Sequence, residues 1–93
     1  MALTIKEHHG LFSVAGSINA TTAKHFQTHF ENILNVSGDL TIDIENINEI
    51  DEDGINAIRV LYNNALNFDR GFLIIGNVSQ SIFESIRGIK VAA

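Results

Sequence analysis

Four acidic side chains stand within five positions at the start of EIDEDGINAIRV, residues 49–60, ahead of a glycine and a segment with helical apolar spacing. Clustered carboxylates can bind calcium, transfer protons or present an anionic surface to a basic partner. The surrounding sequence is acidic as well. Fifteen consecutive residues carry seven of the eleven acids of the chain and no Lys or Arg: Asp39, Asp43, Glu45, Glu49, Asp51, Glu52 and Asp53.

A calcium loop of the EF-hand type explains only the first half of this pattern. The residues that match its ligand and glycine positions are Glu49, Asp51, Asp53 and Gly54. The eighth position should be apolar and is Asn56, and the twelfth should be a bidentate Glu and is Val60. We therefore predict no specific metal site here.

Catalysis has equally little support in the sequence. General acid–base catalysis needs a carboxyl group with a raised pKa in a pocket and a partner group across a cleft. The sequence shows no pattern of residues that would supply both. His25 and His29 are four residues apart, but a surface position is the usual state of such a pair, as it is for His8 and His9 in a predicted turn. We predict a non-enzymatic domain without cofactor or metal.

Composition restricts the class of protein further. The 93 residues, with 45% hydrophobic and 18% charged side chains, are typical of one soluble globular domain spanning residues 1–93. The net charge of −5 argues against nucleic acid and anionic lipid as direct partners and favours a basic protein. The chain has no cysteine and no apolar run long enough to enter a membrane, so we expect a cytoplasmic location.

The hydrophobic periods predict the elements that hold the acidic stretch. LTIKE and LFSVAG alternate at period two around HHG, which indicates a hairpin, and LTIDI at 40–44 is a third strand. GFLIIG is typical of a strand covered on both faces, and IKVAA can add a last edge strand.

Three helices alternate with these strands. The first begins near Thr21 and ends at SGD, the second follows the acidic stretch, and the third begins with Ser79 as N-cap and ends near Gly88. The apolar positions of the first two helices are Ala23, Phe26, Phe30, Ile33 and Leu34, then Ile55, Ile58, Leu61, Tyr62, Ala65 and Leu66. We also expect the rings of Phe72 and Phe83 in the core.

The alternation of strands and helices predicts an α/β fold, with a mixed sheet of four or five strands and helices packed on it. Strands joined by helices pair in parallel through right-handed crossovers. In such sheets, sites collect in the loops that leave the carboxyl ends of strands, here near residues 45–54 and 76–79.

The stretch DIENINEIDEDG, residues 43–54, resembles without a gap the pattern Asp-Leu-Ser-x-Val-x-Phe-Ile-Asp-Ser-Ser-Gly of STAS domains, the fold of bacterial anti-sigma-factor antagonists. GSIN at 16–19 is similar to their Gly-Glu-Leu-Asp at the end of the second strand. Asp43, Asp51 and Gly54 match outright, and the isoleucines at 44, 47 and 50 match by type. The closing stretch GNVSQSIFESIRGI also suits the family.

This resemblance implies a regulatory domain that binds an anti-sigma factor of the kinase type. In the family, the kinase ends the association by phosphorylating the second Ser of Asp-Ser-Ser-Gly. Asp53 occupies that phosphoacceptor position here, and Glu52 stands for the serine before it. Asn19 replaces the usual Asp, and Glu49 replaces a usual apolar residue.

Three interpretations of Asp53 follow. Its carboxylate is a permanent partial mimic of phosphoserine, a helix N-cap that Asp and Ser fill equally well, or part of an acidic docking surface. The predicted partner-binding residues are Asn19, Glu49, Asp51, Glu52, Asp53, Gly54 and Asn56. The hydroxyl groups that remain as alternative phosphorylation sites are those of Ser17, Thr21, Thr22 and Ser79.

The predicted function is therefore that of a non-catalytic regulatory interaction domain. Two alternatives stay open: an accessory STAS subunit of a lipid or anion transport complex, and a module that binds a nucleotide or another small ligand. The oligomeric state and the identity of the partner are open as well.

Overall fold

The computed structural model describes residues 3–86 and 91–92. Its elements come in the order predicted from the two hydrophobic periods. They are β1 (Leu3–His8), β2 (Leu11–Ile18), α1 (Ala23–Ser37), β3 (Leu40–Ile50), α2 (Glu52–Asn67), β4 (Phe72–Ile75), α3 (Gln80–Ile86) and β5 (Val91–Ala92).

The sheet is mixed, as expected, with five strands in the order β1-β2-β3-β4-β5. β1 and β2 form the predicted antiparallel hairpin, and the other neighbours pair in parallel through helical crossovers. The hairpin loop consists of His9 and Gly10, whose φ angles of 52° and 84° are the positive values that a tight two-residue turn requires. His8 and His9 are exposed there.

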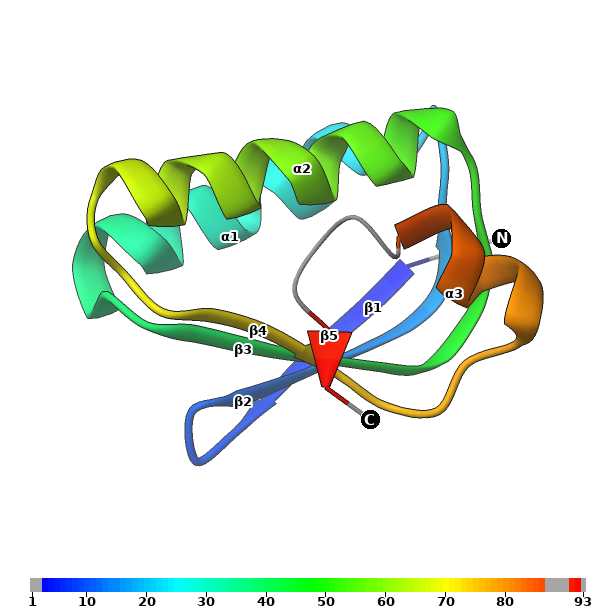
Figure 1. Cartoon of the computed structure of the whole chain (residues 1–93), viewed down its shortest axis with the longest axis horizontal. Helices are drawn as coiled ribbons and strands as arrows, with labels where there is room; N and C mark the ends of the chain where they lie inside the picture. The colour runs from blue at the N-terminus through cyan, green and yellow to red at the C-terminus, as the bar shows by residue number, and fades with distance from the viewer. Residues whose placement is uncertain (1–2, 87–90, 93) are drawn as a thin grey trace.

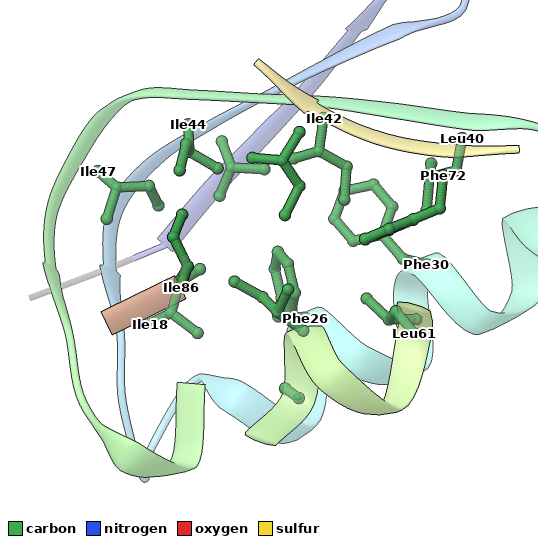
Figure 2. Packing of buried hydrophobic residues seen from close by; sticks show 14 of the residues in the cluster. Ile18, Phe26, Phe30, Leu40, Ile42, Ile44, Ile47, Leu61, Phe72 and Ile86 are labelled. Atoms are coloured by element: carbon green, nitrogen blue, oxygen red, sulfur yellow. The ribbon is translucent and has the colours of Figure 1, made fainter. Parts of the chain in front are cut away.

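The hydrophobic core lies between the sheet and the helices. α1 and α2 lie along one face of the sheet, and Ile86 of α3 joins the same core next to Ile18 (Figures 1 and 2). The rings of Phe26 and Phe30 pack edge to face with their centroids 5.0 Å apart, and Phe12 meets Phe30 at 5.4 Å. The contact between Phe12 and Phe30 anchors α1 on β2.

β3 is longer than the sequence indicated and ends at Ile50, where the predicted strand ended at residue 44. Its register with β2 shifts twice, once between Ser13 and Ala15 and once between Gly16 and Ser17, so β3 carries bulges. Each bulge adds one residue, which is why apolar residues recur three positions apart at Ile44, Ile47 and Ile50. Glu45 and Glu49 therefore belong to a strand, and the predicted loop from 45 to 54 is wrong in its first part.

Three expectations about burial fail. Leu66 is 59% exposed and Phe83 45% exposed, although both were expected in the core. Strand β4 buries Phe72 and Ile74 against the helices and leaves Leu73 and Ile75 half-buried on the other face, so it is not covered on both faces.

Ser79 caps α3 as predicted, because its Oγ accepts a hydrogen bond from Ile82 N–H at 3.3 Å. The predicted helix end at Arg87 and Gly88 lies outside the described residues.

Candidate functional site

Asp51 is the residue that starts α2. Its backbone is extended, with φ −105° and ψ −172°, and its Oδ1 accepts a hydrogen bond from Gly54 N–H at 3.1 Å. Its Oδ2 accepts a second one from Ala20 N–H at 3.3 Å, in the loop between β2 and α1. The helix cap that the sequence offered to Asp53 therefore belongs to Asp51, and that interpretation of Asp53 is wrong. The cap geometry requires an extended residue, and Asp53 already lies inside the helix.

Gly54 holds the first turn of α2 close to the end of β2. A Cβ atom at this position would lie 2.5 Å from the carbonyl oxygen of Ile18 and 2.7 Å from Cγ1 of Ile50, distances that no side chain tolerates. Gly54 is buried and has a role in packing, and its predicted contact with a partner stays a prediction.

Asn19 orders the loop that precedes α1. Its Oδ1 accepts hydrogen bonds from the N–H groups of Thr21 at 2.9 Å and Thr22 at 3.2 Å. The hydroxyl of Thr22 donates to the carbonyl of Ser17 at 2.8 Å. An amide oxygen accepts these bonds as a carboxylate would, so Asn19 can fill the place of the Asp that the sequence resemblance led us to expect.

The predicted site thus divides into a framework and a surface. Asn19, Asp51 and Gly54 are half-buried or buried and hold the loops together. The four remaining residues are exposed, and their side chains form no hydrogen bond or ion pair with the described part of the chain; we call them the acidic surface: Glu49, Glu52, Asp53 and Asn56. Their polar groups are free to contact another molecule.

A groove next to the acidic surface was not found from the sequence. It has a volume of about 360 Å³ and runs between α1 and α2, from their first turns as far as Gln27 and Val60; its lining residues are Ala20, Ala23, Lys24, Gln27, Asp53, Asn56, Ala57 and Val60. Lys24 brings a positive charge to the same groove as Asp53. The sequence does not reveal this groove, because nothing in the order of residues shows that α1 and α2 lie side by side.

The structure also bears on the two metal hypotheses. α2 begins at Glu52, so residues 49–60 do not form the closed calcium loop of an EF-hand. His25 and His29 have ring centroids 6.2 Å apart; His25 is exposed and His29 is half-buried against Phe30. Within residues 3–86 and 91–92, no three His, Cys, Asp or Glu side chains are grouped as metal ligands.

The four hydroxyl groups proposed as alternative phosphorylation sites differ in access. Ser17 is 1% exposed. Thr22 is half-buried, and its hydroxyl donates a hydrogen bond to the carbonyl oxygen of Ser17. Thr21 and Ser79 are exposed. Only these last two could meet a kinase without local opening of the fold.

None of the helices in the described part of the chain has the length and apolar composition that a membrane crossing requires.

The structure is similar to those of several known proteins. The anti-sigma factor antagonist SpoIIAA, in its unphosphorylated form, superposes on this chain with a TM-score of 0.76 at 8% identity, and the match covers 99% of this chain and 88% of SpoIIAA.

Two further structures agree with this. An anti-sigma factor antagonist from Mycobacterium paratuberculosis has a TM-score of 0.75 at 17% identity, covering 97% of this chain and 83% of its own. An RsbS variant from Moorella thermoacetica has a TM-score of 0.67 at 18% identity, with coverages of 99% and 86%. At these identities the similarity is one of fold.

The sequence evidence is separate from the similarity of fold. No curated protein sequence matches the chain. The family model of the STAS domain matches residues 1–91, which include the framework residues and the acidic surface. This chain belongs to the STAS domain family.

Proposed function

We propose that residues 1–93 form one cytoplasmic, non-catalytic interaction domain, which binds a basic surface of a protein partner through the acidic surface at the start of α2. We infer from the similarity to anti-sigma factor antagonists that the partner is an anti-sigma factor of the kinase type. Asp53, in the position of the phosphoacceptor, then acts as a permanent anion in the contact.

The proposal rests on a difference between Asp51, which makes hydrogen bonds within the fold, and the other three acids near the start of α2, whose side chains make none with the residues that the structure describes. Asp51 alone supplies the cap of α2 and the bond to Ala20, so the fold does not need the carboxylates of Glu49, Glu52 and Asp53 for these tasks. Three exposed carboxylates close together repel one another, which opposes folding slightly. Binding a cationic surface removes this repulsion and supports a function in docking.

Electrostatic docking has a recognisable dependence on salt. Exposed charges contribute mainly through steering and complementarity, and both weaken as salt screens them. A phosphoserine mimic predicts the opposite effect of mutation, since removing Asp53 would then restore the form that binds the kinase. We expect the docking behaviour, because the charge is spread over three side chains and is not concentrated at Asp53.

The test begins with affinity purification from the native cell, using the full chain, and mass spectrometry of the captured proteins. Calorimetry at low and high salt then compares wild type with Asp53→Ser and Glu52→Gln. The matched control is Asp69→Asn, which removes one charge beyond the other end of α2 at a residue whose φ of 56° Asn accepts well.

We expect each variant of the acidic surface to weaken binding by about threefold to tenfold at low salt, and the difference to shrink at high salt. Asp69→Asn should stay within about twofold of wild type. Tighter binding of Asp53→Ser would support phosphoserine mimicry. Unchanged binding of both variants would refute docking through this surface. Capture of a transporter subunit in the affinity purification would refute the anti-sigma partner and support a role in a transport complex.

A further inference from the structure

A second cavity lies between α1 and α2 at the end of the helix pair that is remote from the acidic surface. It has a volume of about 300 Å³, and its lining residues are Glu31, Asn32, Leu34, Asn35, Asn64 and Phe68; we call it the amide cavity. Phe68 follows Asp53 by fifteen residues, or about 22 Å along a helix axis. The two sites are therefore separate surfaces of the domain.

Glu31 provides the charge of the amide cavity. Its Oε2 accepts hydrogen bonds from Gln27 Nε2 at 3.2 Å and from Asn64 Nδ2, across the helix pair, at 3.4 Å. Both donors are neutral amides, which orient the carboxylate without cancelling its charge. Within residues 3–86, Glu31 has no Lys, Arg or His as an ion-pair partner. A half-buried carboxylate held in this way favours a cation as ligand.

The backbone adds negative potential to this end of the molecule. α1 ends at Ser37 and α2 at Asn67, and neither helix has a basic residue in its last turn to balance the partial negative charge of its free carbonyls. Arg70 lies close to Gly38 at the end of α1, where its Nη1 would be 2.9 Å from an added Cβ, but it does not line the cavity. The cavity itself therefore has no cation of its own among its lining residues.

Two apolar side chains, Leu34 and Phe68, line the cavity beside the charged centre. Phe68 is 55% exposed. Val36, near the end of α1, is 86% exposed. Exposed large apolar side chains grouped near a cavity indicate contact with another molecule. A flat cation can also stack on an aromatic face such as that of Phe68.

We propose that the amide cavity binds the guanidinium group of an arginine in a segment of a partner protein, with an apolar residue next to that arginine. The planar guanidinium offers five donors, which match the Glu31 carboxylate and the carbonyl oxygens of Asn32, Asn35 and Asn64. Its face can stack on Phe68, and the neighbouring apolar residue can cover Val36. This site goes beyond the proposed function, because it neither uses nor requires the acidic surface.

The test is an NMR titration of the full-length, ¹⁵N-labelled chain with the peptide acetyl-Leu-Arg-Leu-amide. The reference ligand is the same peptide with citrulline in place of arginine, which keeps the shape and loses the charge. We expect shifts in the backbone signals of residues 31–35 and 64–68 and in the amide side chains of the three asparagines. The citrulline peptide should bind at least about tenfold more weakly than the arginine peptide, which is the usual cost of losing a charged hydrogen bond.

Glu31→Gln should weaken binding of the arginine peptide by about tenfold, since the amide keeps the acceptor for Gln27 and Asn64 but removes the charge. The matched control is Glu84→Gln in α3, where Gln80 Nε2 donates to Glu84 Oε2 at 2.8 Å in the same spacing. That variant should bind within about twofold of wild type, as expected for a charge remote from the site. Phe68→Leu should weaken binding several-fold.

Other outcomes overturn the proposal. These are equal binding of the two peptides, no binding of either, shifts confined to the acidic surface, and full binding by a folded Glu31→Gln variant. Asp53→Ser distinguishes this site from the proposed function, because it should leave the titration unchanged even if it abolishes binding of the anti-sigma partner.

Discussion

The carboxylate of Asp51 accepts a hydrogen bond from the backbone N–H of Ala20, thirty-one residues earlier in the chain, at 3.3 Å. The same carboxylate caps α2 through Gly54. In addition, Asp51 N–H donates to the carbonyl of Ile18 at 3.1 Å. Asp51 therefore ties the start of α2 to the end of β2, and it supports the acidic surface without belonging to it.

Replacing Asp51 by Ala should destabilise the domain by about 1–2 kcal/mol, because it removes a helix cap and leaves the N–H of Ala20 without its acceptor. Replacing Asp53 by Ala should cost about 0.5 kcal/mol or less, the value of an exposed acid in a first turn. Urea denaturation followed by circular dichroism measures both. Equal losses for the two variants would contradict the assignment of the cap to Asp51.

Replacing Gly54 by Ala should destabilise the domain by about 1–3 kcal/mol, since the new Cβ would overlap the carbonyl of Ile18 and the side chain of Ile50. Helix propensity alone predicts the opposite sign, a gain of about 1 kcal/mol. The neighbouring exposed residue gives the control, because Asn56→Ala adds no such contact and should be close to neutral. A stabilised Gly54→Ala variant would show that α2 does not approach β2 this closely.

Replacing Asn19 by Ala should lower the melting temperature by about 4–8 °C, which corresponds to about 1 kcal/mol in a domain of this size. The reason is the loss of the acceptor for Thr21 and Thr22 N–H. Asn19→Asp keeps that acceptor and should melt within about 2 °C of wild type. Differential scanning calorimetry compares the three proteins. If Asn19→Asp lowers the melting temperature as much as Asn19→Ala, a carboxylate oxygen does not replace the amide oxygen as acceptor in this loop.

Much of the fold was predictable because its signals are local. Alternation at period two marked β1, β2 and the first half of β3, and helical spacing placed Phe26, Phe30 and Leu61 in the core, where the structure has them. The STAS pattern also located the start of α2 near Asp53. These features depend on neighbours a few residues away, which a linear sequence contains.

The end of β3 and the edges of the core were not predictable in this way. The bulges of β3 are set by its register with β2, so the apolar spacing of three at Ile47 and Ile50 had no meaning without the partner strand. Leu66 and Phe83 fit the hydrophobic pattern but are 59% and 45% exposed. Burial depends on which surfaces meet, and the order of residues does not contain that.

By itself the sequence determined the type of domain and the concentration of acids near residue 53. Only the tertiary structure decided that Asp51 is the cap, that Glu52 and Asp53 remain exposed, and that Lys24 shares a groove with Asp53. The physical reason is the range of the interactions involved. Side chains more than thirty positions apart, such as Glu31 and Asn64, meet only after α1 and α2 have packed side by side on the sheet.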